Sequence, residues 1–355
     1  MKGKVSIVVE NSKNLTTGGD IVGLKLKEGL SRKEEVFTIS ISEKNYSFKF
    51  LGERIPNFFK TAQIITDLEK SKVCFFNYFF DFASLYFLFI SFFSGNRNVI
   101  AFHTFFKKGI KLVDLIYSAK RFVLLNFAIV FSDKIIFLTN AQREGFRTYA
   151  ILRKKFDNMT SVISNGIEKR WIINKKHNIH GINLIYIGRL VSQKGSKQIL
   201  EISEDKNLFS QMVVVGSGNK NLERRFDNIE KVNYYKSIDN KKIFGLYDKS
   251  NIFLLPSYSE VFPIVILEAM ARGLVILVSD IPGMREIVKE GRNGYLFPPG
   301  DIEKMKEIIL YLKNNPKELE RISKNNLKDI WKFTAEKQIP KYLKVYEEVL
   351  GNVKK

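Results

Sequence analysis

The chain has 355 residues, 45% of them hydrophobic and 27% charged, which is ordinary for a globular protein long enough for two domains with separate cores. Its single cysteine, Cys74, excludes an intramolecular disulfide and suits a reducing cytoplasm. The first apolar run, Val5–Val9, is too short for a secretory signal peptide and indicates a first strand.

The formal net charge is +21, and the first half of the chain is the more basic one. Residues 1–180 hold 29 Lys and Arg against 15 Asp and Glu, and the remainder holds 29 against 22. Such a charge fits nucleic acid, an anionic membrane surface, or a basic composition with no specific partner. Between the two specific partners, the sequence favours the membrane, and no nucleic acid is expected.

Short apolar strands alternate with helical patterns along the whole chain, which predicts parallel sheets covered on both faces. In the first half we expect strands at Val5–Glu10, Val36–Ile41, Val73–Phe80, Val99–Phe102, Lys134–Thr139 and Thr160–Ile163. Helices are expected at Asp20–Gly29, at Lys107–Phe122 and from Asn140 onward.

The pattern restarts after a polar segment, Lys169–Gly181, which we interpret as a linker. Strands are then expected at Ile182–Ile187, Met212–Val215, Val232–Tyr235, Ile252–Leu255 and Val275–Val278, with a helix at Ser196–Ser203. The sequence therefore predicts an α/β protein of two doubly wound parallel-sheet domains, with ligands bound in a cleft at the carboxyl ends of the strands.

Residues 73–93 are apolar and long enough to span a bilayer, but Asn77 and Asp81 interrupt them. We interpret the segment as a strand followed by a helix that Asp81 caps. The helix carries more aromatic rings than one core stripe can hold, and Lys107–Phe122 mixes lysines with apolar residues. Shallow binding at a membrane interface explains this composition, as does the packing of one helix on the other.

Glu260 and Glu268 are the most informative residues. Glu260 follows the strand that ends near Pro256, and Glu268 lies five residues beyond Pro263, which suits the first position of a helix ended by Gly273. Five residues correspond to roughly 7.5 Å along the helix axis. Two carboxylates flanking a helix N-terminus suit a ligand with hydroxyls and phosphates, because free amides bind phosphate and carboxylates accept hydrogen bonds from sugar hydroxyls.

Other loops that follow strands carry groups suited to a nucleotide diphosphate. They are Gly18-Gly19, Gly188-Arg189 with Lys194, and Gly216-Ser-Gly218. Each signal is weak alone, since a solvated basic loop looks the same. His103 follows the strand Val99–Phe102 and could hydrogen-bond a sugar hydroxyl. Neither an Asp-x-Asp pair nor a histidine cluster predicts a metal site.

These motifs resemble glycosyltransferase family 4, the retaining enzymes of the GT-B fold. The likeness rests on Ile187-Gly-Arg-Leu with Lys194-Gly195, on Val214–Gly218, on Pro256-Ser with Glu260 and Glu268–Gly273, on Val278–Val288, and on Gly294–Asp301. Val261 stands where the family often has glycine, and Val275 where proline is common.

The resemblance implies a role for each matching position. His103, Arg189, Lys194 and Glu260 would be catalytic. The implied donor-binding residues are Gly18, Gly19, Gly188, Arg189, Lys194, Gly216, Glu260, Phe262, Ile264, Val265 and Glu268. Glu268 would bind the ribose, Glu260 and His103 the sugar, and the remaining groups the diphosphate. No cofactor and no metal are expected. The nucleotide diphosphate sugar is counted as a co-substrate.

The resemblance divides the chain into an acceptor-binding domain at 1–168, the linker 169–181, a donor-binding domain at 182–332, and a last helix at 333–355 that returns to the first domain. It implies a cytoplasmic hexosyltransferase, peripheral at the inner membrane face, that acts on a glycan or lipid-linked glycan. Two alternatives stay open: a GT-B nucleotide-sugar epimerase, and a nonenzymatic basic protein that binds a membrane or nucleic acid.

Overall fold

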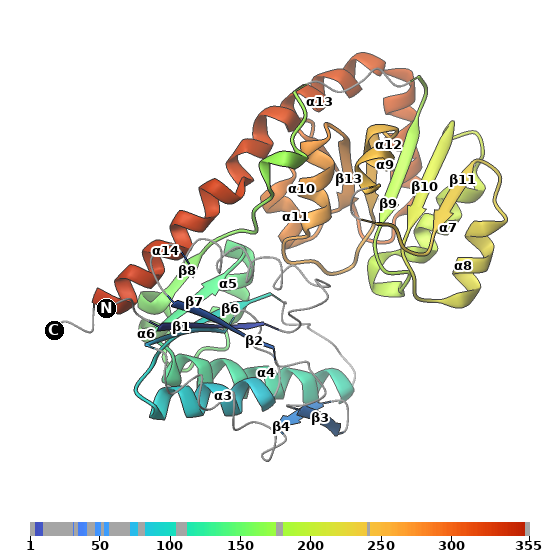
Figure 1. The fold of residues 1–355 in the computed structure, drawn as a ribbon. Helices are drawn as coiled ribbons and strands as arrows, with labels where there is room; N and C mark the ends of the chain where they lie inside the picture. Colours follow the sequence, from blue (N-terminus) through green and yellow to red (C-terminus); the bar gives the residue numbers. More distant parts are fainter. Residues whose placement is uncertain are drawn as a thin grey trace. The chain divides into compact units, whose positions relative to one another are not determined.

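The computed structural model describes residues 4–9, 31, 35–40, 47–50, 53–56, 72–76, 82–103, 112–174, 180–239 and 242–351. Gly18, Gly19 and the helix expected at Asp20–Gly29 lie outside these residues. The chain divides into two compact units (Figure 1). The first comprises Met1–Gly166 together with Ala335–Lys355, and the second comprises Ile167–Thr334.

The first unit contains a parallel sheet of six described strands, all of which the sequence predicts. Their spatial order is β2 (Glu35–Ser40), β1 (Lys4–Val9), β5 (Val73–Phe76), β6 (Arg97–Phe102), β7 (Lys134–Phe137) and β8 (Thr160–Val162). An antiparallel hairpin of β3 (Ser47–Phe50) and β4 (Glu53–Pro56) was not expected.

Both faces of this sheet are buried at β5, β6 and β7, because alternate residues of these strands enter different cores. In β6, Ile100 and Phe102 pack with α3 (Phe82–Phe93) and α4 (Leu112–Phe131). Val99 and Ala101 point the other way, toward Tyr342, Val345, Tyr346 and Val349 of α14 (Ala335–Gly351). The last helix of the chain thus covers one face of the first sheet (Figure 1). Two shorter helices, α5 (Asn140–Arg147) and α6 (Arg153–Met159), add Phe146 and Phe156 to the first core.

Residues 73–76 form strand β5 and residues 82–93 form helix α3, which confirms the prediction of a strand followed by a helix. No helix within the described ranges is both long and apolar enough to cross a bilayer. The end predicted for the next helix at Phe122 is wrong, because α4 continues to Phe131. Its added turns bury Ala128 and Ile129 in the core, and this burial outweighs the strand-like composition of the segment.

The second unit contains a parallel sheet of six strands, five of which the sequence predicts. The order is β11 (Val232–Tyr235), β10 (Gln211–Val215), β9 (Asn183–Ile187), β12 (Ile252–Leu255), β13 (Val275–Ser279) and β14 (Gly294–Phe297). Its α-helices are α7 (Ser196–Glu204), α8 (Lys220–Asp227), α9 (Ile243–Asp248), α10 (Ile264–Ala271), α11 (Pro282–Ile287), α12 (Ile302–Asn314) and α13 (Pro316–Asp329). Short 3-10 helices lie at Lys169–Trp171, Ser192–Lys194 and Ile330–Phe333.

The beginning of the segment expected to be a linker lies against the second unit. The ring of Trp171 contacts Phe244 with centroids 4.4 Å apart, and Ile173 donates its amide to the carbonyl of Ala271 at 3.1 Å. Residues 169–173 are therefore part of the packing of this unit.

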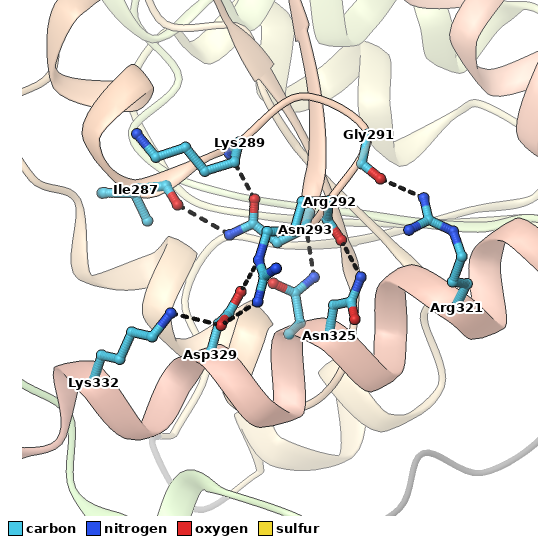
Figure 2. A network of polar contacts seen from close by, with 10 residues as sticks. Ile287, Lys289, Gly291, Arg292, Asn293, Arg321, Asn325, Asp329 and Lys332 are labelled. Carbon is cyan, nitrogen blue, oxygen red and sulfur yellow. Dashed lines mark hydrogen bonds and ion pairs between the residues drawn. The ribbon is translucent and has the colours of Figure 1, made fainter.

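The turn that precedes the edge strand β14 is fastened to α13 by polar contacts (Figure 2). The guanidinium of Arg292 binds both carboxylate oxygens of Asp329 at 2.8 and 3.0 Å, and Lys332 adds a contact at 2.8 Å. The side chain of Asn293 bonds the amide of Lys289 and the carbonyl of Ile287 within the turn. This network holds the edge of the sheet.

Candidate functional site

The loops after β9 and β10 are joined by their backbones. The amide of Gly188 donates to Val215 at 3.0 Å, and the amide of Leu190 donates to Ser217 at 2.9 Å. A Cβ at Gly216 would lie 1.9 Å from the carbonyl oxygen of Gly188, and one at Gly218 would lie 2.5 Å from that of Leu190. The two glycines that the sequence matches to a nucleotide fingerprint thus allow two loops to touch.

The loop after β9 also contacts the loop after β12. Gly195 has φ +71°, and a Cβ there would lie 2.1 Å from the carbonyl oxygen of Pro256. The amide of Tyr258 donates to the carbonyl of Gln193 at 2.9 Å. Since only glycine permits both the left-handed backbone and this approach, Gly195 sets the distance between the two loops.

This approach joins two of the predicted site residues in an ion pair. The ammonium of Lys194 contacts Oε1 of Glu260, and the hydroxyl of Ser257 donates to the same oxygen at 3.1 Å. Only 21% of the Lys194 side chain and 11% of the Glu260 side chain are exposed. The described residues provide no hydrogen bond to Oε2 of Glu260, so that oxygen can accept one from a ligand hydroxyl.

Glu268 lies in α10, and its carboxyl group has a hydrogen-bond partner in α9. The hydroxyl of Tyr247, a buried residue of α9, donates to Oε2 of Glu268 at 2.8 Å. Burial raises the pKa of Glu268 to about 7, and the Tyr247 hydrogen bond acts in the opposite direction. The carboxyl group is therefore close to half ionised at neutral pH.

The N-terminus of α10 lies just after Phe262 and Pro263. Pro263 is the N-cap, so the helix begins at Ile264, one residue later than predicted. No side chain caps this end, and the first amides of a helix have no partner inside it. The amides of Ile264 and Val265 thus have the arrangement that favours binding of an anion.

The loop that carries Glu260 packs closely against α11. A Cβ at Gly283 would lie 2.3 Å from the carbonyl oxygen of Glu260 and 2.4 Å from that of Val261. Phe262 is buried, and the centroid of its ring lies 5.6 Å from that of Phe333.

The two departures from the family pattern cause no backbone conflict. Among the described residues, Lys231 is the only non-glycine residue with a positive φ, so the backbone of Val261 does not require glycine. At Val275 the amide donates to Asn251 at 2.8 Å, a bond that proline could not make.

The other predicted residues lie in different parts of the chain, two of them after β9 of the second unit and one after β6 of the first. Arg189 is exposed at the end of β9, and its carbonyl accepts a 2.9 Å hydrogen bond from the hydroxyl of Tyr186. A Cβ at Gly188 would lie 2.9 Å from the hydroxyl oxygen of the same tyrosine. His103 directly follows β6 of the first unit, and burial lowers its pKa to about 4, so its imidazole is neutral at pH 7. Gly18 and Gly19 are not among the described residues.

Of the predicted residues, the structure brings Lys194 and Glu260 into contact, and three further residues that shape the region are not indicated by the sequence. Tyr247 comes from a different helix, 21 positions before its partner, and no motif spacing points to it. Ser257 and Gly283 lie inside recognisable motifs, but their contacts depend on how the loops fold. No group of three His, Cys, Asp or Glu residues able to hold a metal occurs in the described parts of the chain.

Comparison with known proteins finds a family model that matches this region. Residues 169–329 match the family model of glycosyl transferases group 1. An uncharacterized glycosyltransferase of Haemophilus influenzae is 30% identical over 202 residues, which are 53% of this chain and 54% of that protein.

A second relative has a stated reaction. It is the N,N'-diacetylbacillosaminyl-diphospho-undecaprenol alpha-1,3-N-acetylgalactosaminyltransferase of Campylobacter jejuni, 28% identical over 236 residues, or 63% of this chain and 62% of that protein. The matches thus span less than two thirds of the length of both curated relatives.

Among solved structures, Anabaena HepE in complex with UDP-glucose matches 99% of both chains with a TM-score of 0.76 and 16% identity. At that identity the likeness concerns the fold. The chain has the GT-B fold, and its residues 169–329 are similar to the group 1 glycosyltransferases.

Proposed function

We propose that the protein is a retaining, metal-independent glycosyltransferase of family 4 that moves a hexosyl unit from a nucleotide diphosphate sugar to a glycan or lipid-linked glycan. The observation that carries the proposal is the arrangement around α10. The uncapped N-terminus of α10 follows Glu260, which pairs with Lys194, and Glu268 lies in the same helix, within the region that matches the family model.

Each part of a nucleotide diphosphate sugar has a matching group in this arrangement. Glu268 accepts hydrogen bonds from the ribose hydroxyls through its ionised carboxylate, which offers only acceptor oxygens. The amides of Ile264 and Val265 bind the diphosphate, with Arg189 and Lys194 as its cations. Glu260 receives a sugar hydroxyl on Oε2, since its Oε1 is held by Lys194 and Ser257.

In the proposed reaction, a hydroxyl oxygen of the acceptor forms a bond to C1 of the sugar while the bond from C1 to the β-phosphate oxygen breaks. The acceptor proton passes to that phosphate oxygen, and the attack comes from the face that the diphosphate leaves, which retains the anomeric configuration. Arg189, Lys194 and the helix amides stabilise the charge that develops on the diphosphate. His103 stays a predicted hydroxyl-binding residue of the first unit.

The acceptor is proposed from the named relative and from the composition of the chain. The Campylobacter protein acts, by its name, on an undecaprenol diphosphate glycan. A lipid-linked acceptor would place the enzyme at the cytoplasmic face of the membrane, where cell-surface polysaccharide or glycolipid is built. The net charge of +21 supports an anionic surface as a partner.

A thermal-shift panel of UDP, GDP, ADP, CMP and their sugar conjugates, without metal and with EDTA, tests the donor site. One diphosphate should raise the Tm of the wild type, and Glu268→Ala should remove that increase. Glu307→Ala, an exposed change on α12, serves as the control and should keep it. No increase with any nucleotide at millimolar concentration would contradict the proposal.

The chemistry is tested by the product. NMR of the product formed with the identified donor should show the anomeric configuration of the donor in a new glycosidic bond. Release of an isomerised sugar nucleotide without acceptor would instead identify an epimerase. An inverted product would exclude the retaining mechanism and leave donor binding intact.

A further inference from the structure

Helix α4 is apolar on two opposite sides. Leu124, Leu125, Ala128 and Ile129 are buried in the core of the first unit. Phe122, Val123 and Val130 are exposed, and at about 100° per residue they lie on the side of the helix away from the buried set. A surface helix ordinarily carries polar residues there, so the outer stripe of α4 needs an explanation.

The stripe continues onto α3 through a cluster of rings. Phe92 lies 5.0 Å from Phe131, and Phe89 lies 6.4 Å from Phe127, measured between ring centroids. Phe93 packs on Phe89 at 4.4 Å and is 67% exposed. Helices α3 and α4 lie beside each other on the same face of the sheet (Figure 1). Their exposed rings therefore form one surface.

The other side of the stripe adjoins the segment between α5 and α6. The Asn126 side chain accepts from the amide of Ile151 at 2.9 Å and donates to the carbonyl of Tyr149 at 3.1 Å. Lys155 donates to the carbonyl of Val130 at 3.2 Å. These bonds hold Ile151, which is 67% exposed, next to α4. We name the resulting surface the apolar face: Phe89, Phe92, Phe93, Phe122, Val123, Val130, Ile151 and Leu152.

Three consecutive exposed cations border the apolar face, namely Arg153, Lys154 and Lys155. The nearby acid Asp157 is occupied, since it accepts two hydrogen bonds from Arg147 at 2.7 and 2.9 Å. Within the described residues, neither Arg153 nor Lys154 has an ion pair. This border therefore presents an excess of positive charge beside large apolar side chains.

We propose that the apolar face binds the surface of an anionic phospholipid bilayer, with its aromatic and aliphatic side chains in the interfacial layer and residues 153–155 on the lipid phosphates. Amphipathic surfaces with cations beside aromatic residues bind membranes through two contributions: burial of the apolar side chains and attraction of the cations to anionic lipids. A symmetric dimer through the same face would bring both cationic segments to one interface, which disfavours a second copy as the occupant. The inference goes beyond the proposed sugar transfer and does not rest on it.

The test is co-sedimentation with vesicles of phosphatidylcholine alone and with phosphatidylglycerol added. The wild type should pellet with the anionic vesicles and much less with the neutral ones. Phe93→Ser with Ile151→Ser, and separately Arg153→Glu with Lys154→Glu, should each lower the partition coefficient by about tenfold or more. All four positions are exposed, so the variants should fold.

Matched controls lie on the second unit. Leu310→Ser with Tyr311→Ser removes exposed apolar side chains from α12, and Lys317→Glu with Lys328→Glu reverses exposed charges on α13. Both should bind vesicles as the wild type does. Equal binding of all variants, equal binding to neutral vesicles, or no binding by the wild type would overturn the proposal.

Light scattering in the absence of lipid gives a further outcome. A wild-type dimer that becomes monomeric in the Phe93/Ile151 variant would show that a second copy covers the face, and would overturn the membrane assignment. The nucleotide-induced Tm shift of each variant is measured in parallel. Because that shift reports the second unit, failure of vesicle binding and failure of the donor proposal remain distinguishable.

Discussion

The hydroxyl of Tyr247 donates to Oε2 of Glu268 at 2.8 Å, and this bond joins α9 to α10. Burial raises the pKa of Glu268 while the hydrogen bond lowers it. The tyrosine thus favours the ionised carboxyl that accepts hydrogen bonds from a ligand.

Replacement of Tyr247 by Phe should weaken binding of the nucleotide. Without the hydroxyl, the pKa of Glu268 rises further, and a larger fraction of the carboxyl group is protonated at neutral pH. We expect the dissociation constant of the diphosphate to increase about tenfold at pH 7 and to recover partly at pH 8.5. Calorimetric titration at both pH values checks this. An unchanged affinity at pH 7 would mean that Tyr247 only packs.

Glu268 should also make the free protein less stable as the pH rises. Its pKa in the folded state, about 7, lies above the usual value of 4.5, so the folded state binds more protons between these values. Stability from this group is therefore complete below about pH 4.5 and is lost as the pH rises through 7. In Glu268→Gln this loss should disappear. Urea unfolding at pH 5 and pH 8 measures it, and a parallel pH dependence in both proteins would refute it.

Gly195→Ala should destabilise the second unit by about 2 kcal/mol or more, because a Cβ would meet a carbonyl oxygen at a left-handed backbone position. Gly245→Ala is the matched control: a Cβ there meets nothing within 4 Å, and the residue lies inside α9. That change should be neutral or stabilising by about 0.5 kcal/mol. Thermal unfolding of both variants decides, and equal effects would contradict the role given to Gly195.

The Lys194–Glu260 pair should show strong coupling. Removal of one partner leaves the other charge poorly solvated, so Lys194→Met and Glu260→Gln should each cost about 1–3 kcal/mol of stability. The double variant should cost clearly less than the two together. Denaturant unfolding of the four proteins gives the coupling energy. A value near zero would show that solvent screens the pair.

Asp329 should contribute to acid unfolding. Arg292 and Lys332 hold its pKa at about 2, so its stabilisation is complete above the unfolded value of 3.8 and is lost as the pH falls through 2. The Asp329→Asn variant should be less stable than the wild type at pH 6 by about 1–2 kcal/mol, and this difference should shrink toward pH 2. Urea unfolding between pH 2 and 6 tests it; a constant difference would contradict the assignment.

The sequence predicted the sheets well because a strand buried on both faces is a nearly continuous apolar run, as β12 and β13 are. It was less successful where burial follows from tertiary packing. β14 begins with Gly294 and Tyr295 and reads as a turn, yet a Cβ at Gly294 would meet the carbonyl of Ile276 at 2.1 Å. The glycine permits the close pairing that makes the segment a strand.

For the candidate site, residue types and their order after strands indicated Glu260, Glu268, Arg189 and Lys194. The sequence could not show that Lys194 pairs with Glu260, since both had been assigned to the ligand. Such a pairing depends on the distance between two loops, which Gly195 sets in three dimensions. Local spacing carries no information on that distance.

The chain leaves the first unit at Gly166 and returns to it at Ala335, and these two residues pack against each other, with a Cβ at Gly166 placed 3.1 Å from the Cα of Ala335. On the ribosome, residues 167–334 are therefore synthesised completely before α14 emerges. Until then one face of the first sheet, with Val99 and Ala101, lacks its cover. The second unit can mature first, while the first unit waits for α14 and until then exposes apolar residues of its sheet.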